Sequence, residues 1–467
     1  MEGLEASIVA VNDLSKENPK LRLDAQFQNR AALEVIQKIA ALDHLRVSDL
    51  TPRPLKGKNI PYDDEGIFPV IRSGDISNSF QPAGLLRSSA RSDAFFVRTE
   101  DILISSIGQG SIGKVQLFRN DGEFATVSEV TVVRVNNFSA ACVAAFLESH
   151  FGQAQIERYV TGATGQLHLY PNDVDRILIP NFSKAFQDRI SAFYARQWVL
   201  HRASYAALAK AEERLLETLG LADWTPPEPL SYAARASDAF AAGRLDAQYF
   251  MPAKEQVRQS LATLPGRPLG DRVDSIRDMF VPSRAQPEKL VRNYNLTDAL
   301  VPLLNFEKEP QTASEIGSVK KSFKDGDVAI SRLRAYLREV AVVRTGDDMP
   351  SVGSSEFIVL RPKVGQTGIS PETLMVFLRA APTQNILKWC QDGSQHPRFS
   401  ERDLLSIPVP DAVADVSNQI TTIVQQGFAA RHKARQFLEA ARRAVEIAIE
   451  DGEDAALAYL DATEGAE

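Results

Sequence analysis

The chain of 467 residues has few of the residues that build metal and disulfide sites. It has two cysteines, Cys142 and Cys390, which lie far apart, and no Cys-x-x-Cys spacing. Its six histidines are scattered and match no zinc-binding spacing. This usage predicts a reducing compartment, no disulfide framework and no metal site.

Long apolar runs are also lacking. No stretch approaches the roughly 18 apolar residues that a membrane-spanning helix needs. The first twenty residues do not have the charged-then-apolar order of a secretory signal. We therefore expect a cytoplasmic protein.

Catalytic motifs are absent as well. The sequence contains no HExxH, no GxSxG and no NPPY-like methyltransferase motif. The stretch GQGSIGKV at 108–115 fits GxGxxG and nearly fits a P-loop, but Lys114 is followed by Val115 and not by Ser or Thr. A strand-like run follows where a nucleotide site needs a helix. The stretch predicts a hairpin turn, and the chain as a whole reads as non-catalytic.

The net charge of −7 argues at first against a nucleic-acid partner. It equals the seven acidic residues between Glu450 and Glu467, where there is no Lys or Arg. The rest of the chain is neutral and can carry local basic faces. We expect 452–467 to form an acidic C-terminal tail.

A long amphipathic helix is predicted at 183–220. Its apolar residues recur at alternating steps of four and three, the period of a coiled-coil seam. About 36 residues at roughly 1.5 Å each give a rod of about 55 Å. The seam consists mainly of Tyr194, Trp198, Tyr205, Leu208, Leu215 and Leu219.

The chain contains two copies of one module. RLDAQF at 22–27 recurs as RLDAQY at 244–249, DILIS at 101–105 recurs as DVAIS at 327–331, and SEV at 128–130 recurs as SEF at 355–357. The order is kept while the shift drifts slowly, as small insertions in a duplicated domain would cause. The second copy should therefore end in its own long helix, and a seam of the same period contains Ile420, Val424, Leu438 and Val445. We expect the two helices to pack antiparallel and bury both apolar stripes.

The pattern within each copy is mixed, so each module is α/β or α+β. Copy one shows a helix at 31–42, strands at 102–107, 114–118 and 130–135, and a helix at 140–159. Copy two repeats this with strands at 328–333, 340–344 and 357–361 and a helix at 371–390. The predicted divisions are 1–182 (first module), 183–220 (first long helix), 221–243 (Pro-rich extended linker), 244–410 (second module), 411–451 (second long helix) and 452–467 (tail).

Basic residues mark the candidate nucleic-acid contacts. Between 319 and 344 there are seven Lys or Arg against three Asp or Glu. Alternation from Arg332 to Arg338 would put these side chains on one strand face, either as a DNA-reading row or as an ordinary solvated face. His168 and His396 fall in loops that the repeat makes equivalent. The candidates are Arg72, Ser73, Arg87, Gln109, Lys114, His168, Lys320, Lys321, Arg332, Arg334, Tyr336, Arg338 and Arg398.

In the order of these motifs the sequence resembles the specificity (S) subunits of type I restriction–modification systems. The resemblance rests on RLDA opening each half, GIFPVIRSGDI at 66–76, DILIS with a following Gly-Lys at 101–114, and a late Ile-Pro before a long helix containing Gln187 or Gln419. Copy two lacks the Gly-Lys turn, and YNLTD at 294–298 is the best counterpart of the RSGD segment.

The resemblance implies two globular target-recognition domains held apart by an antiparallel pair of long coiled-coil helices. Each domain would read one half of a split site in double-stranded DNA, and the helices would set the gap and dock methyltransferase subunits, two in number. Restriction subunits would be further partners in phage defence. S-adenosylmethionine, ATP and magnesium would bind the partners and not this chain. Two alternatives stay open: a coiled-coil scaffold that binds proteins without DNA specificity, and the specificity subunit of a fused cutting-and-methylating system.

Overall fold

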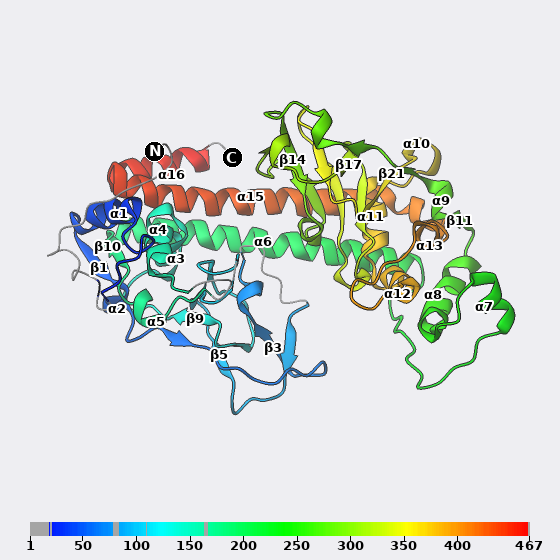
Figure 1. The fold of residues 1–467 in the computed structure, drawn as a ribbon, viewed down its shortest axis with the longest axis horizontal. Coiled ribbons are helices and arrows are strands. Elements are labelled where there is room, and N and C mark those ends of the chain that lie inside the picture. Colours follow the sequence, from blue (N-terminus) through cyan, green and yellow to red (C-terminus); the bar gives the residue numbers. More distant parts are fainter. Residues whose placement is uncertain (1–17, 19–20, 78–83, 109, 163–166, 466–467) are drawn as a thin grey trace. The chain divides into compact units, whose positions relative to one another are not determined.

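The computed structural model describes residues 18, 21–77, 84–108, 110–162 and 167–465. The chain divides into two compact units (Figure 1). Unit 1 is Met1–His201 with His432–Glu467, and unit 2 is Arg202–Arg431. Each unit therefore contains one end of each of the two long helices, α6 (Lys184–Thr218) and α15 (Ser417–Glu450).

Unit 1 contains two four-stranded sheets, of order β2-β9-β6-β7 and β4-β3-β8-β5, and a pair β1-β10. Its strands are β1 (His44–Arg46), β2 (Leu55–Lys56), β3 (Phe68–Ile71), β4 (Leu86–Ser88), β5 (Phe95–Val97), β6 (Ile102–Ser105), β7 (Val115–Leu117), β8 (Phe124–Thr126), β9 (Val130–Val133) and β10 (Leu178–Pro180). Its shorter helices are α1 (Arg30–Ala40), α2 (Val47–Leu50), η2 (Ser73–Asp75), α3 (Ala140–Glu148), α4 (His150–Tyr159), α5 (Pro171–Val174) and α16 (Glu453–Gly465).

Unit 2 contains two five-stranded sheets, of order β12-β21-β18-β19-β15 and β13-β17-β20-β14-β16, and a pair β11-β22. Its strands are β11 (Gly266–Pro268), β12 (Val273–Ile276), β13 (Met279–Phe280), β14 (Leu290–Tyr294), β15 (Leu303–Asn305), β16 (Gln311–Thr312), β17 (Lys320–Phe323), β18 (Val328–Ser331), β19 (Val340–Arg344), β20 (Ser351–Gly353), β21 (Phe357–Pro362) and β22 (Pro408–Pro410). Its shorter helices are α7 (Ala236–Ala242), η3 (Ala247–Phe250), α8 (Pro252–Thr263), α9 (Leu269–Arg272), η4 (Pro282–Arg284), η5 (Leu296–Leu300), η6 (Ala313–Glu315), η7 (Ala335–Leu337), α10 (Val364–Thr367), α11 (Pro371–Arg379), α12 (Ala381–Cys390), α13 (Glu401–Leu405) and α14 (Ala412–Asp415).

The predicted duplication is confirmed by the sheet topology. The order β2-β9-β6-β7 of unit 1 matches β12-β21-β18-β19 of unit 2, and β4-β3-β8-β5 matches β16-β14-β20-β17. The parallel pair β3/β8 has a parallel counterpart in β14/β20, while the flanking pairs are antiparallel in both. Unit 2 adds β13 and β15 at sheet edges.

Each unit is layered because its central strand is apolar on both faces. In β6, Ile102 and Ile104 join a core with the helices, while Leu103 joins the core of the second sheet. In β18, Val328 and Ile330 face helices and Ala329 faces the second sheet. Side chains alternate along a strand, so a wholly apolar run predicts burial on both faces. The mixed α/β class expected from the sequence is correct.

The RLDA motif has the same local structure in both units. The Arg22 guanidinium donates to Asp24 and to backbone carbonyls at the end of α4, and Arg244 donates to Asp246 and to carbonyls at the end of α12. A guanidinium placed there satisfies carbonyls that a helix end leaves without a partner. The repeat therefore preserves a helix-capping device.

A buried carboxylate joins neighbouring strands in each unit. Asp101 accepts two hydrogen bonds of 2.7 Å from Arg134, and Asp327 accepts bonds of 2.8 and 2.9 Å from Arg361. Both carboxylates are almost fully buried. The repeated Asp before each central strand is thus a scaffold residue.

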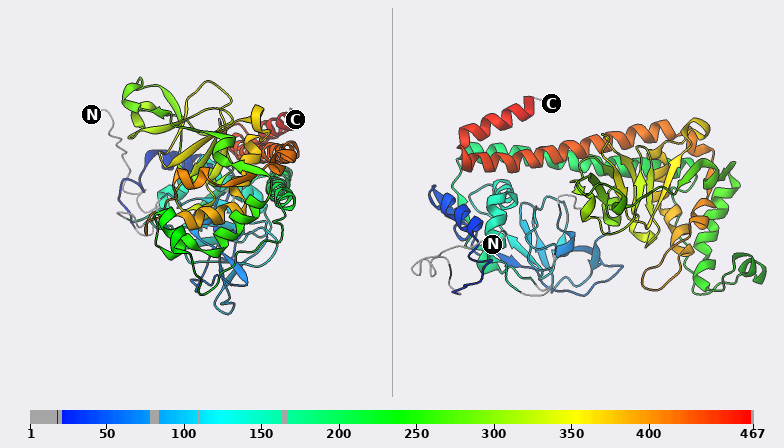
Figure 2. Two further views of the ribbon diagram at one scale, coloured as in Figure 1. Left: turned by 90° about the vertical axis from the view of Figure 1, so that its right-hand side faces the viewer. Right: turned by 45° about the horizontal axis from the view of Figure 1, so that its top comes forward.

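Within each unit, the segments of the two long helices lie side by side and antiparallel (Figures 1 and 2). In unit 1, the Phe193 ring of α6 contacts the Phe437 ring of α15 at 5.3 Å between centroids. In unit 2, Arg214 Nε of α6 donates to Gln419 Oε1 of α15 at 2.9 Å. Most predicted seam residues are buried and the others are half-buried: Tyr194, Leu215, Leu219, Ile420, Val424, Leu438 and Val445 are buried, and Trp198, Tyr205 and Leu208 are half-buried.

Three predicted elements differ from the structure. The helix predicted at 140–159 is broken because Ser149 caps α4, accepting a hydrogen bond from Gly152 N. The helix predicted at 371–390 is broken at Ala380, just before a Pro in the first turn of α12. The predicted linker at 221–243 includes the helix α7.

The acidic segment after α15 is an ordered helix and not a tail. In α16, Ala456 and Leu460 are fully buried in the core of unit 1. Arg189 of α6 pairs with Asp461 at 2.7 Å and also with Glu464. Part of the acidic charge of this segment is therefore paired with α6.

Neither cysteine forms a disulfide, and both are buried. Burial raises the pKa of Cys390 to about 11. Among the described residues, no helix is long and apolar enough to cross a membrane.

Candidate nucleic-acid interface

The basic stretch that follows β18 is a loop and not a strand. β18 ends at Ser331, and Arg334 and Arg338 have left-handed backbones, with φ of 45° and 53°, on either side of η7. Side chains alternate between faces only along an extended backbone. The prediction of one face shared by four side chains is therefore wrong for Arg332, Arg334, Tyr336 and Arg338.

Backbone hydrogen bonds hold this loop in place. Arg334 N donates to the Pro397 carbonyl at 3.1 Å. The half-buried Arg379 guanidinium donates to the carbonyls of Arg338 at 2.7 Å and Val340 at 2.9 Å. Burial lowers the pKa of Arg379 to about 10. The backbone is thus fixed while the Tyr336 side chain stays 58% exposed.

One carboxylate offsets two of the candidate cations. Glu356 accepts hydrogen bonds from Arg398 Nη2 at 2.8 Å and Nε at 3.1 Å, and Arg332 Nε lies 3.3 Å from the same carboxylate. The bond from Arg398 holds the pKa of Glu356 below its ordinary value. Together these three side chains carry one net positive charge. Arg334 is exposed beside them, whereas Arg338 lies 3.7 Å from Glu212.

The two candidate lysines of unit 2 lie in its other sheet. Lys320 and Lys321 are half-buried on β17, opposite Phe280 and Met279 of β13. The loop after β18 extends from the first sheet, so the basic stretch is divided between two sheets.

The register of two short bridges aligns the loops of the two units. His168 pairs with Ile107 and Thr161, while Arg398 pairs with Leu333 and Asp392. His168 therefore corresponds to Arg398. The two loops are equivalent, as predicted, but His396 lies two residues before the residue that matches His168.

Glu129 is the unit 1 counterpart of Glu356. Ser106 N donates to the Glu129 carbonyl at 2.8 Å, and Arg332 N donates to the Glu356 carbonyl at 3.1 Å. In unit 1 the carboxylate accepts a hydrogen bond of 3.0 Å from Ser73 Oγ. The same carboxylate position thus has a neutral partner in one unit and two cations in the other.

Two candidate arginines of unit 1 are held by intramolecular bonds. Arg72 Nε lies 3.1 Å from Asp75, and Arg87 donates to the carbonyls of Gly66 at 2.6 Å and Ile67 at 3.0 Å. Asn295 and Asp298 form the same turn in unit 2, as Asn295 N donates to Asp298 at 2.7 Å. This agrees with the expected match between RSGD and YNLTD.

The Gly-rich turn joins β6 to β7 as an antiparallel hairpin, as predicted. Gly108, Gly110 and Gly113 all have positive φ, which explains the three glycines. Lys114 is exposed. Gln109 lies outside the described residues.

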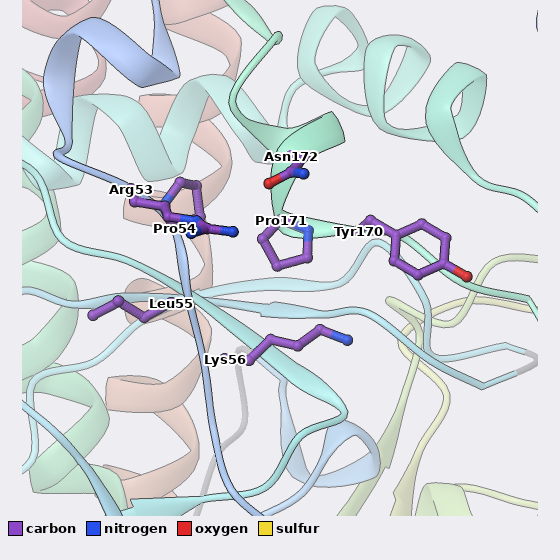
Figure 3. A pocket seen from close by; sticks show the side chains of 7 residues that line it. All are labelled: Arg53, Pro54, Leu55, Lys56, Tyr170, Pro171 and Asn172. Atoms are coloured by element: carbon purple, nitrogen blue, oxygen red, sulfur yellow. The ribbon is translucent and has the colours of Figure 1, made fainter. Parts of the chain in front are cut away.

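A hollow of about 600 Å³ in unit 1 contains residues that the sequence did not single out (Figure 3). Arg53 and Lys56 line one side, and Tyr170 and Asn172 line the other. Lys56 Nζ lies 5.8 Å from the centroid of the Tyr170 ring, and His168 stacks on that ring at 5.9 Å. The basic residues of PRPLKGK at 52–58 could have been singled out from the sequence. Their proximity to Tyr170 could not, because it depends on the fold.

The described residues contain no group of three or more His, Cys, Asp or Glu side chains placed to hold a metal ion. The lining of the hollow includes guanidinium, ammonium, phenol and amide donors. Such donors suit the binding of phosphates and base edges.

The chain matches no protein-family model and no curated protein. It is similar to the crystal structure of the type I restriction–modification S subunit from M. genitalium, with 14% identity over 89% of this chain and 95% of that chain, at a TM-score of 0.35. It is also similar to the HsdS subunit from Thermoanaerobacter tengcongensis, with 16% identity over 88% and 96% of the two chains, at a TM-score of 0.28. A structure describing complex assembly of the type I system covers 88% of this chain, with 97% of its own length, 16% identity and a TM-score of 0.27.

Two of these structures are described as parts of type I restriction–modification systems and the third as an HsdS subunit. At these scores they add no argument about function, which rests on the geometry of this chain.

Proposed function

We propose that this chain is the non-catalytic DNA-specificity subunit of a restriction–modification complex, each unit reading one part of a bipartite site in double-stranded DNA. The observation that carries the proposal is a duplicated scaffold with changed outward chemistry. The Asp–Arg pairs of Asp101 and Asp327 are kept, whereas Glu129 binds a serine and Glu356 binds two arginines. Two domains that recognise different base sequences need a common scaffold and different polar side chains on it.

The long helices suit a spacing role. α6 has 35 residues and α15 has 34, so each rises about 50 Å along its axis. One turn of B-DNA is about 34–36 Å long. Helices of that length favour two half-sites with an unread gap between them.

The chemistry of methylation and cleavage belongs to the partners in this proposal. Two methyltransferase subunits dock on the helices, and restriction subunits join them in cutting. S-adenosylmethionine, ATP and Mg²⁺ bind those partners. The complex acts in the cytoplasm, where it meets both cellular and phage DNA.

The test exchanges residues 1–182 for the first module of another specificity subunit and maps methylated sites in cells that carry the methyltransferase. The proposal expects one half-site to change and the other to persist. A wholly new site, or an unchanged one, contradicts it. If the assembled complex binds no duplex pool at low salt, the alternative of a protein-binding scaffold stands. A neighbouring gene that encodes cutting and methylating in one polypeptide would indicate a fused system.

A further inference from the structure

Two cations, Arg53 and Lys56, line the hollow of unit 1 (Figure 3). Within the described part of the chain, neither Arg53 nor Lys56 forms an ion pair. The charge of Arg53 influences the half-buried Asp175 carboxylate, but the two groups form no ion pair. The positive charge of the hollow is therefore available to a ligand.

The corresponding place in unit 2 is neutralised. Leu55 pairs with Val132 and Ile276 pairs with Val359, and these pairs occupy equivalent positions in the matched sheets. Counting along β2 and β12 from this register, Arg53 corresponds to Asp274 and Lys56 corresponds to Arg277.

Both unit 2 residues have partners of opposite charge. Asp274 lies 3.3 Å from Lys363 Nζ, and Arg277 lies 3.4 Å from Glu401. The duplication thus supplies an internal comparison: the same two scaffold positions carry two cations without ion pairs in unit 1 and two residues with ion-pair partners in unit 2.

We propose that the hollow binds a backbone phosphodiester of the DNA duplex and anchors unit 1 on it. This inference rests on the proposed function. Guanidinium and ammonium groups are strong donors to phosphate oxygens, and tyrosine hydroxyl and asparagine amide groups also contact phosphates. Arg53, Lys56, Tyr170 and Asn172 supply all four kinds of donor around one space.

A stacked base or free nucleotide fits the hollow less well. The Tyr170 ring already contacts the His168 ring and Lys56, so its faces are partly occupied. A phosphodiester needs donors and not an open ring face. Because phosphate contacts carry no base information, the anchor sets the register of unit 1 and not its sequence preference.

The test uses the complex assembled with its methyltransferase subunits and two duplexes, one with the methylated site and one with a scrambled sequence. The double variant R53Q/K56Q removes both cations, and R277Q removes the paired cation at the equivalent position of unit 2. Affinity is measured over a series of salt concentrations. Thermal melting confirms that each variant is folded.

We expect the double variant to lose affinity for both duplexes alike. The slope of log K against log salt should become less negative by about 0.9, the change expected for one lost phosphate contact. R277Q should keep the wild-type slope. An unchanged slope in the double variant overturns the proposal, and so does a loss confined to the target duplex.

Titration of inorganic phosphate into the full chain distinguishes a site for free phosphate from a site for a DNA phosphodiester. Heat that the double variant lacks, with an unchanged duplex slope, would identify a free-phosphate site and overturn the proposal. If the wild-type complex binds neither duplex, the proposed function is contradicted, and this inference, which rests on it, is contradicted as well.

Discussion

The hydroxyl of Tyr194 on α6 donates a hydrogen bond to Glu148 at the end of α3, at 3.4 Å. Glu148 faces a small cavity of about 30 Å³, which Trp198 and His201 also line. Desolvation raises the pKa of Glu148 to about 8, against the opposing influence of Arg442 and of the bond from Tyr194. Unit 1 thus keeps a neutral carboxyl against a long helix at neutral pH.

This carboxyl predicts a stability that falls as pH rises. Between the ordinary pKa of Glu, about 4.3, and the raised value, the folded state binds a proton that the unfolded state releases. Stability should fall by at most about 1.4 kcal/mol per pH unit in that window, and by less because the side chain is partly accessible. Urea denaturation from pH 5 to 8 measures it. The variant E148Q should flatten the profile, and an equal slope in both proteins would refute the account.

The close approach of the long helices at Gly427 predicts a size limit there. A Cβ added at this position would lie 2.9 Å from Ala207 Cβ and 3.2 Å from the Ser204 carbonyl oxygen. G427L should therefore destabilise the chain by about 1–3 kcal/mol, the usual cost of overpacking. Ala429 is exposed on the same helix, so A429L is the matched control. Equal melting temperatures for the two variants would contradict this contact.

The carboxylate shared by Arg332 and Arg398 predicts a gain of DNA binding on its removal. E356Q leaves both guanidinium groups without their carboxylate partner. The assembled complex should bind a scrambled duplex more tightly at low salt, with a salt slope more negative by about 1. E439Q makes the same charge change on α15, at an exposed pair with Arg435, and serves as control. If both variants behave alike, Glu356 has no special relation to the interface.

Residues that maintain the scaffold could be predicted from the sequence. Arg22, Asp24, Asp101 and their copies recur in the same order because each makes several bonds that a substitution would break. The heptad period likewise predicted α6 and α15, since a long helix can bury only one stripe.

Loop conformation could not be predicted in the same way. The left-handed backbone at Arg334 and Arg338 is supported by bonds to Pro397 and from Arg379, which lie far along the chain. The match of His168 with Arg398 depends on strand register. The sequence does not show that His396 is offset by two residues from this match. The breaks before α4 and α12 did have local signals, in Ser149 and Pro382, that the apolar pattern outweighed.

The helix pair predicts a defined change of the DNA gap. Deleting 199–205 from α6 and 427–433 from α15 removes one heptad from facing stretches of the pair, near the contact of Arg431 with Tyr205. Seven residues rise about 10.5 Å, close to three base pairs of 3.4 Å. Methylation mapping should show both half-sites intact and the gap shorter by about three base pairs. An unchanged gap would mean that the helices dock other subunits and do not set the spacing of the half-sites.

The most direct test of the central claim is to map every methylated site in cells that express this chain with its methyltransferase. Two units with a common scaffold and different polar loops predict one bipartite site, with two short specified parts and an unread gap between them. A single continuous site, or methylation without sequence preference, would contradict the account.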